Sequence, residues 1–450
     1  MESLTRKLSD FLADLTYENI PGAVADKAKF VLLDTLGAML AGSQSAEGRI
    51  ARQLSRKVCG KVESTLIASS RKVDCLYAAL FNGIMAHALE LDDGNRYAMG
   101  HPGVSVIPTV IALGEKEKIS GKQAIAAIVA GYETFGRIAA AGNPSHYNRG
   151  FHTTGTCGVF GAAAAAGKIF GFDTADMIRT LGIAGSQSAG LFAFMSNGAM
   201  TKVLHAGKAA HSGILSGLLV QEGFTGPDSV LEHSQGFYAA YTDRFAPERV
   251  IDGLGETYEI LNTYTKYHAA CRHVHPAVDA VLFITRQNRI DPVDIATINV
   301  RTYQVAARLT AGKEISTPLS GKMSLPYCVA VAAVDGQVGL KQFAEARLSD
   351  TTLLDVMNKV DLQPDEKYEG LIPRHRSARV EIVLKTGQHY EKEITDALGE
   401  PENPGSLEDL LAKFKDSAAG VLRKKKMDLL IDAAQRLEKI ENLNQLTSFL

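Results

Sequence analysis

The 450-residue chain has almost no excess of charge of either sign. It contains 48 lysine and arginine residues against 50 aspartate and glutamate residues, which gives a formal net charge of −2. A general electrostatic attraction to nucleic acid or to an anionic membrane is therefore not expected. An anionic ligand would have to be bound by a local group of cationic side chains.

Cysteine is scarce and scattered. The five residues are odd in number and form no CxxC pair: Cys59, Cys75, Cys157, Cys271 and Cys328. This spacing favours neither a disulfide framework nor a zinc site, so we expect reduced thiols.

Long apolar runs are also missing. The N-terminal segment MESLTRKLSDFLADL alternates charged and apolar residues and lacks the apolar centre of a signal peptide. The longest runs of small and apolar residues, 124–130 and 162–166, are too short and too interrupted to cross a bilayer. We therefore expect a cytoplasmic protein with no membrane partner.

Three glycine signatures do not occur: a GxGxxG loop after a strand, a Walker loop and a GxSxG elbow. Their absence argues against a nucleotide cofactor and against serine hydrolysis. What the chain does have is 46% hydrophobic and 22% charged residues, which is typical of a globular enzyme and excludes a disordered or fibrous protein.

Two patterns of hydrophobic spacing divide the chain. In the first part, alanine- and glycine-rich segments predict closely packed helices at 23–41, 76–93, 121–140, 155–169, 174–189 and 201–222. In the second part, alternation predicts strands at 295–303 and in a hairpin over 376–394, with helices at 277–288, 326–335, 340–346 and 351–359.

The predicted fold class is therefore mainly α with α+β. We expect a large all-helical domain over 1–262, a smaller α+β lid domain over 263–397, and C-terminal helices over 398–450 that return to the helical domain. The basic run 423–426 indicates a solvated helix face.

The first segment with chemical potential is HALELDDGNRYAMGHPG, residues 87–103. In a helix that ends near Gly94, the side chains of His87, Glu90 and Asp93 would share one side. Acidic residues are disfavoured at a helix C-terminus, and such a conflict favours a functional site, although backbone capping around a buried histidine is the alternative. His101 lies in a Gly-His-Pro-Gly turn whose stiff backbone would aim its side chain.

Two further segments lie at predicted helix starts. HYNRGFHTTGTCG contains Tyr147, Arg149 and His152, a set of donors and cations suited to a carboxylate, with a surface loop capped by threonine as the alternative. In TKVLHAGKAAHSG, Lys202 occupies the first helical turn. A lysine is electrostatically misplaced there unless an anion is present, which makes Lys202 a candidate anion ligand.

The second part of the chain has its own polar segments. KYHAACRHVHPAVDA contains Lys266, Arg272 and His275, and GKMSLPYC contains Tyr327. An HxH pair without cysteine or an HExxH motif is weak support for a metal, so no metal site is predicted.

Together these segments resemble the MmgE/PrpD family, in order and over roughly the whole chain. The resemblance rests on HALELDDGNRYAMGHPG, HYNRGFHTTGTCGVFGAAAAAGKIFG, TKVLHAGKAAHSG with GFTGP, CRHVHPAVDA and KMSLPY. It implies a large helical domain, a smaller α+β lid, a cleft between them, a homodimer, and no metal or organic cofactor. The family includes 2-methylcitrate dehydratase, cis-aconitate decarboxylase and iminodisuccinate epimerase.

Matching the family motifs one by one assigns the site residues Glu90, Asp93, His101, His152, Lys202, His275 and Tyr327. The chain departs from the family twice. First, Gly94 stands where the dehydratases and decarboxylases tend to have threonine, and the segment between Gly94 and the His-Pro pair is one residue longer than in those members. Second, Glu90 stands where they have aspartate.

We therefore expect a cofactor-independent lyase of the dehydratase type, which abstracts the alpha proton of a small di- or tricarboxylate. The expected catalytic residues are His101, His152, Lys202, Tyr147, His275 and Tyr327. The expected substrate-binding residues are Glu90, Asp93, Arg149, Arg272 and Lys266. The alternatives are an epimerase of an amino- or imino-dicarboxylate, a cis-aconitate-type decarboxylase, and a binding protein that retains the fold without catalysis.

Overall fold

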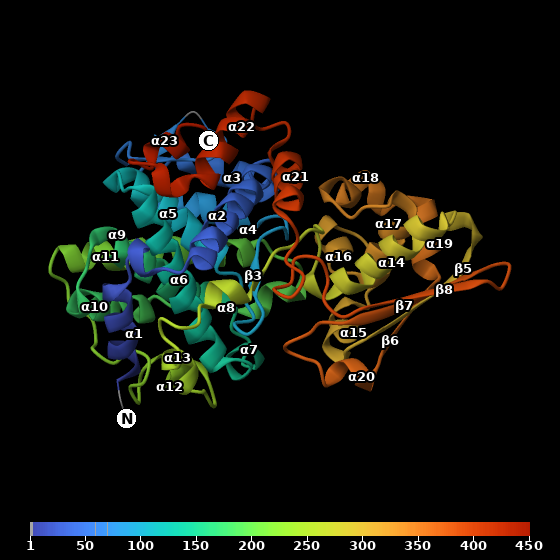
Figure 1. The fold of residues 1–450 in the computed structure, drawn as a ribbon, viewed down its shortest axis with the longest axis horizontal. Helices are drawn as coiled ribbons and strands as arrows, with labels where there is room; N and C mark the ends of the chain where they lie inside the picture. Colours follow the sequence, from blue (N-terminus) through green and yellow to red (C-terminus); the bar gives the residue numbers. More distant parts are fainter. Residues whose placement is uncertain (1–2, 59, 70) are drawn as a thin grey trace. The chain divides into compact units, whose positions relative to one another are not determined.

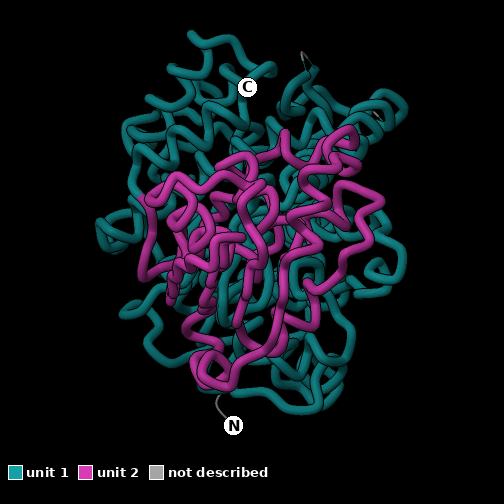
Figure 2. Tube along the Cα trace, turned by 90° about the vertical axis from the view of Figure 1, so that its right-hand side faces the viewer, with its two compact units in different colours: residues 1–263, 406–450 teal, residues 264–405 magenta. Residues whose placement is uncertain are grey.

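The computed structural model describes residues 3–58, 60–69 and 71–450 (Figure 1). Cys59 lies outside these ranges, and the other four cysteines are free thiols in buried positions. The chain forms two compact units (Figure 2): unit 1 comprises Met1–Thr263 with Ser406–Leu450, and unit 2 comprises Tyr264–Gly405. The predicted fold class is confirmed, because unit 1 is helical and unit 2 contains a small mixed sheet.

Residues 398–405, which the sequence analysis groups with the C-terminal helices, belong to unit 2. Backbone bonds explain this division. The amide of Thr265 donates to the carbonyl of Gly399 (2.9 Å), and the amide of Leu398 donates to Oδ2 of Asp279 (2.8 Å).

Unit 1 is built almost wholly of helices. Its described helices are α1 (Leu4–Asp14), α2 (Gly22–Gly42), α3 (Ala46–Ser55), α4 (Cys75–His87), α5 (Gly103–Glu117), α6 (Gly121–Gly142), α7 (Ser145–Asn148), α8 (Thr153–Thr156), α9 (Gly158–Phe170), α10 (Thr174–Ser186), α11 (Thr201–Gln221), α12 (Phe237–Tyr241), α13 (Glu248–Ile251), α21 (Leu407–Ala418), α22 (Lys424–Gln435) and α23 (Asn444–Thr447). The C-terminal helices, red in Figure 1, lie beside the blue and cyan ones: α21 packs on α2, and α23 on α5.

Most of the predicted helices are confirmed, but two boundaries are wrong. The helix expected over 76–93 is α4, which ends at His87, so the acidic residues follow the helix instead of crowding its last turn. The helix expected over 155–169 is divided into α8 and α9 at Cys157. Helix α5 was not predicted.

Small residues let the central helices approach closely, as their composition predicts. Helix α11 packs against both α4 and α9. A Cβ atom added to Gly83 of α4 would lie 2.7 Å from Cα of Gly207 in α11, and one added to Gly213 would lie 2.4 Å from Cβ of Ala162 in α9. Side chains at these glycines would force the helix axes apart.

Helix α6 belongs to this core. Among the described helices, α6 alone is long and apolar enough to span a membrane, with 22 residues and a mean hydropathy of 1.2. The run 124–130 does not reveal the length of this helix. However, 94% of its apolar window is buried inside the protein, which is typical of a core helix.

Unit 2 is organised by a four-stranded sheet with the order β6-β5-β7-β8. The strands are β5 (Ile295–Thr302), β6 (Val360–Pro364), β7 (Ala378–Leu384) and β8 (His389–Ile394). β5 pairs in parallel with β6 and antiparallel with β7, and β7 forms the predicted hairpin with β8. The parallel strand β6 was not predicted.

Alternation along the strands gives this sheet its buried face. Val380 and Ile382 of β7 are buried, as are Ile298 and Val300 of β5. Helix α14 (His275–Asn288) packs on β7 and β8, and α17 (Leu325–Asp335) packs on α14 and on α19 (Thr351–Asn358). The helix expected over 340–346 is a 3₁₀ turn (Leu340–Phe343) followed by the short α18 (Glu345–Leu348).

Replacing Gly207 by alanine should destabilise unit 1, because the added Cβ would lie 2.1 Å from the backbone oxygen of Leu80. Overpacking of this kind costs about 1–3 kcal/mol, which exceeds the gain in helix propensity of roughly 1 kcal/mol. Gly22→Ala is the matched control, since nothing lies within 4 Å of a Cβ there. We expect thermal unfolding to give Gly207→Ala the lower Tm, and equal Tm values would contradict the close approach.

Candidate active site

Four histidines from distant parts of the sequence meet inside unit 1. His87 ends α4, His101 precedes α5, His152 precedes α8 and His205 lies on α11. The ring centre of His87 is 5.0 Å from that of His101 and 5.8 Å from that of His152. The His152 and His205 rings are 5.3 Å apart, with their Nδ1 atoms at 3.0 Å. The fold therefore brings the two candidate catalytic residues His101 and His152 into one cluster with His87 and His205.

The carboxylate of Asp92 links two of these rings. Its Oδ2 lies 2.9 Å from Nδ1 of His87 and 3.0 Å from Nδ1 of His101. Nδ1 of His101 also lies 2.5 Å from the carbonyl oxygen of Asp93. Because carboxylate and carbonyl oxygens only accept, these contacts assign the proton to Nδ1 of each ring and leave Nε2 with a lone pair.

Burial keeps three of the imidazoles neutral. It lowers the pKa of His87 to about 3, against the opposing effect of Asp92. It also lowers the pKa of His152 well below the ordinary value, with further lowering by the neighbouring histidines, and it lowers that of His205. The side chain of His101 is 16% exposed, whereas that of His87 is fully buried. His101 is therefore the member of the His87–Asp92–His101 group that solvent reaches.

The anion predicted beside Lys202 is a side chain of the protein itself. The ammonium group of Lys202, in the first turn of α11, forms an ion pair with the carboxylate of Glu90. Glu90 has a φ of 57°, a left-handed conformation that is uncommon for a residue with a Cβ and is concentrated at functional sites. The prediction that His87, Glu90 and Asp93 share one side of a helix is wrong, because α4 has already ended.

Asp93 supports the turn that carries His101. Its Oδ2 accepts a hydrogen bond from the hydroxyl of Tyr132 (2.6 Å), and its Oδ1 accepts one from the amide of Gly103 (3.1 Å). Burial, reinforced by the nearby carboxylates of Asp34 and Asp92, raises the pKa of Asp93 to about 6. Both carboxylate oxygens are thus engaged within the protein.

The segment around His152 divides into two groups. Tyr147 and His152 both contact the ring of Phe192, at centroid distances of 4.6 and 5.3 Å. Arg149 is instead 40% exposed and pairs with the exposed carboxylate of Asp243 (2.6 Å). The structure therefore gives Arg149 an exposed partner outside the histidine cluster.

One ligand atom from each of His87, Asp92 and His101 lies within 4.8 Å of the other two, a spacing compatible with a metal ion. Nδ1 of His87 and Nδ1 of His101 already lie 2.9 and 3.0 Å from Oδ2 of Asp92. A metal ion bound through these nitrogens would have to displace their protons and would compete with these contacts.

Unit 2 contains the other predicted residues. Lys266, Arg272 and His275 are all buried, and Nη2 of Arg272 lies 2.5 Å from Oε1 of Glu400. Burial, followed by the charge of Arg272, places the pKa of His275 well below the ordinary value, and Nε2 of its ring lies 3.2 Å from the carbonyl oxygen of Ala270.

Tyr327 is also buried, but its hydroxyl has structural partners. The hydroxyl oxygen lies 3.1 Å from the carbonyl of Gln342 and 3.3 Å from that of Arg347. Burial raises the pKa of Tyr327 to about 12. These contacts tie α17 to the segment that follows it.

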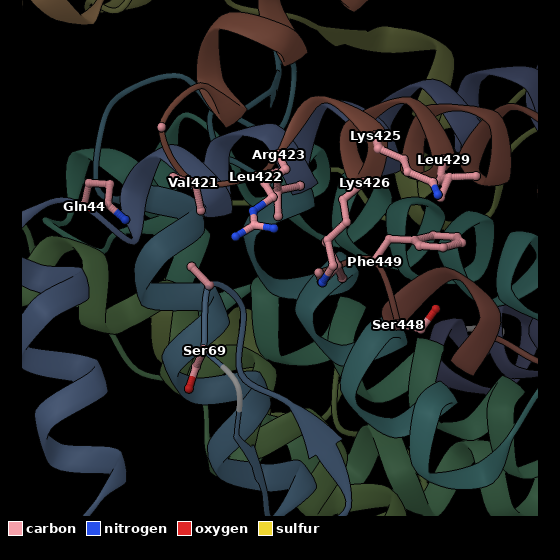
Figure 3. Close-up of a pocket in the computed structure, with 13 residues that line it drawn as sticks. Gln44, Ser69, Val421, Leu422, Arg423, Lys425, Lys426, Leu429, Ser448 and Phe449 are labelled. Atoms are coloured by element: carbon pink, nitrogen blue, oxygen red, sulfur yellow. The ribbon is translucent and has the colours of Figure 1, made fainter.

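A hollow on unit 1 has a volume of about 830 Å³ and a different lining (Figure 3). Arg423, Lys425, Lys426, Leu429 and Phe449 border it, and none of the predicted site residues does so. The cations of the basic run are exposed, as predicted for a solvated helix face.

Asp92, His87 and His205 are the residues of this cluster that the predicted site omits. The run of carboxylates in the segment HALELDD could have indicated Asp92. However, a helix that continues to Gly94 would place His87, Glu90 and Asp93 on one side and would leave Asp92 off that side. Asp92 takes its place in the cluster only because the chain leaves the helix after His87.

Comparison with known proteins gives matches to both parts of the chain. Residues 6–250 match the MmgE/PrpD N-terminal domain, and residues 268–439 match the MmgE/PrpD C-terminal domain. Cis-aconitate decarboxylase of Aspergillus terreus is 28% identical over 472 residues, covering 99% of this chain and 96% of the relative. Human cis-aconitate decarboxylase is 26% identical over 466 residues, covering 100% and 95%. The cis-aconitate decarboxylase-like protein oryM of Aspergillus oryzae is 25% identical over 472 residues, covering 100% and 97%.

The neutral state of His87 should make the protein sensitive to acid. The pKa in the fold is about 3, below the unfolded value of about 6.5, so the unfolded chain binds more protons at intermediate pH. The contribution of the neutral His87 ring to the free energy of unfolding is complete above pH 6.5. It is lost as the pH falls toward 3, at about 1.4 kcal/mol per pH unit. We expect the Tm of His87→Gln to fall less steeply than that of the wild type between pH 6.5 and 4. The exposed His233→Gln serves as control, and parallel curves for His87→Gln and the wild type would refute the neutral assignment.

Proposed function

Because the chain belongs to the MmgE/PrpD family, we propose that it is a cofactor-independent lyase that transfers the alpha proton of a small di- or tricarboxylate. The observation that carries this proposal is the contact between Asp92 and His101, since it leaves Nε2 of a partly exposed imidazole as the proton acceptor. Family membership supports the carboxylate class of substrate.

The first step is removal of the proton from the carbon next to a carboxylate. That proton is weakly acidic, because its loss places negative charge on the carboxylate oxygens as an enediolate. Nε2 of His101 takes the proton, and the resulting imidazolium is stabilised by Asp92 at 3.0 Å. Lys202 holds the developing charge, sharing its ammonium group with Glu90.

The second step is loss of a hydroxyl group from the neighbouring carbon. The carbon–oxygen bond breaks as the electron pair of the enediolate forms the alkene, and the departing hydroxyl takes up a proton to leave as water. Either the His101 imidazolium or the hydroxyl of Tyr147 supplies this proton. Tyr147 lies near His152, because both contact the ring of Phe192. We assign Tyr147 in preference to Tyr327, whose hydroxyl is bonded to backbone carbonyls.

Decarboxylation is the second candidate, and the curated relatives favour it. The three relatives described above are named cis-aconitate decarboxylases or a decarboxylase-like protein, at 25–28% identity. In that reaction the carbon–carboxylate bond breaks, carbon dioxide leaves, and an imidazolium protonates the carbanion. The neutral imidazoles favour removal of a proton from the substrate, because a neutral ring can act as a base. The names of the relatives favour decarboxylation. A direct test of the two reactions is therefore needed.

Proton NMR in deuterium oxide will distinguish these reactions. The purified protein is incubated with citrate, 2-methylcitrate, cis-aconitate, malate, tartrate and iminodisuccinate, and the alkene and alpha-proton signals are followed together. We expect an alkene from citrate or 2-methylcitrate, or a hydration product from cis-aconitate. New alkene signals from a dicarboxylate formed by loss of carbon dioxide from cis-aconitate would establish the decarboxylase instead. Alpha deuteration without an alkene would establish an epimerase, and no change in any substrate would refute the proposal.

The roles of His101 and Asp92 predict a graded loss of rate. His101→Gln should lower kcat by about 10²–10⁴-fold, as removal of a general base does. Asp92→Asn should lower kcat less and change KM little, because it removes the partner of the base and not the base itself. The exposed His389→Gln should leave both constants unchanged. Full activity of His101→Gln, at an unchanged Tm, would remove His101 from the mechanism.

A further inference from the structure

Two arginine side chains of unit 2 lie close to one tyrosine ring. The guanidinium carbon of Arg272 is 5.1 Å from the ring centre of Tyr264, and that of Arg376 is 5.4 Å from it. Both guanidinium groups also approach Oε1 of Glu400, at 2.5 Å for Nη2 of Arg272 and 3.9 Å for Nη1 of Arg376. Arg376 begins the predicted hairpin over 376–394 and lies in none of the segments from which site residues were predicted, so only the fold reveals this pair.

The pair carries more positive charge than Glu400 neutralises. The side chains of Arg272, Arg376 and Glu400 are only 5%, 12% and 2% exposed, so water screens these charges poorly. Two guanidinium groups meet one carboxylate, and a buried charge without a counter-ion is costly. A further anion at this position would reduce that cost.

The same arginines have unused hydrogen-bond donors. Nε and Nη1 of Arg272 and Nη1 of Arg376 are buried without a hydrogen-bond partner in the described part of the chain. The contacts with Tyr264 do not satisfy them, because a cation–π contact uses the face of the guanidinium while its N–H groups lie in the plane. Since buried donors are almost always paired in folded proteins, three unpaired donors in one pair of arginines indicate a missing acceptor.

The neighbouring histidine, His273, adds no positive charge beside the arginine pair. It is hydrogen-bonded through Nδ1 to the hydroxyl of Tyr303. Burial, followed by the charges of Arg376 and Arg272, lowers the pKa of His273 to about 3, so its ring is neutral. The two guanidinium groups therefore bring two positive charges to the one carboxylate of Glu400.

We propose that Arg272 and Arg376 form a binding site for one carboxylate group of a polycarboxylate. The in-plane N–H groups of guanidinium match the two oxygens of a carboxylate, which lysine does not achieve. The ligand class rests on the proposed function, and the inference adds Arg376 as a residue that selects for an additional carboxylate. A ligand with an amide or ester in place of that carboxylate would bind more weakly.

The alternative is a structural pair that only anchors Glu400. The two roles differ in their effect on the ligand-free protein. If Arg376 is structural, Arg376→Met lowers the Tm. If it awaits an anion, removing an incompletely compensated buried cation leaves the Tm unchanged or raises it.

The test is thermal unfolding and calorimetric titration of the full chain with tricarballylate, an unreactive tricarboxylate. We expect Arg376→Met to weaken tricarballylate binding by about 10–100-fold, the effect of losing a charge-assisted hydrogen bond, with no loss of ligand-free Tm. Arg376→Lys should lie between Arg376→Met and the wild type, because it keeps the charge and loses the planar fork. Arg379→Met is the matched control, since Arg379 is 45% exposed and pairs with Glu391.

Three results would overturn the inference. The first is an Arg376→Met variant that binds tricarballylate as tightly as the wild type, and the second is a wild type that does not bind tricarballylate. The third is a lower ligand-free Tm in Arg376→Met together with wild-type affinity in Arg376→Lys. Binding of inorganic phosphate without tricarballylate would also overturn it, because the site would then not recognise a carboxylate. Turnover is measured separately by NMR. Tricarballylate binding that depends on Arg376, with no turnover of any substrate, would refute the proposed function and leave this site standing.

Discussion

The candidate active site depends on the burial of one carboxylate, that of Asp92. Its Oδ2 lies within 3.0 Å of Nδ1 on both His87 and His101. Because the carboxylate is removed from water and accepts from both N–H groups, these contacts fix the orientation and the tautomer of both rings. In the proposed function, the buried ring of His87 supports the site and the partly exposed ring of His101 transfers the proton.

The position of Asp92 is in turn fixed by segments from both ends of the chain. Lys413 of α21 donates to Oδ1 of Asp34 (2.6 Å) and to the carbonyl of Leu91 (2.8 Å). Tyr132 of α6 binds Asp93 on the other side of Asp92 in the sequence. The loop after α4 is therefore held by α2, α6 and α21, which explains why the return of the C-terminal helices to unit 1 matters for the site.

Each of the two units contains its own group of charged side chains. Unit 1 supplies imidazoles, buried carboxylates and the ammonium group of Lys202, which Glu90 partly neutralises. Unit 2 supplies the guanidinium groups of Arg272 and Arg376 with the carboxylate of Glu400. A chain with a net charge of only −2 thus contains local groups of cations, which binding of an anion requires where there is no general positive field.

The family, the fold class and the elements with a local signal can be predicted from the amino-acid sequence alone. Strand β5 and the β7–β8 hairpin follow from alternation and a turn, and the close packing of α11 follows from its glycines. The sequence also indicated His101, His152 and Lys202. The end of α4, by contrast, was decided by tertiary contacts, because Ala88, Leu89 and Glu90 would continue a helix. The chain instead turns at Glu90, which has a φ of 57° and pairs with Lys202 of α11. The parallel strand β6 and the pairing of Arg272 with Arg376 were decided in the same way, since contacts between distant residues leave no local pattern.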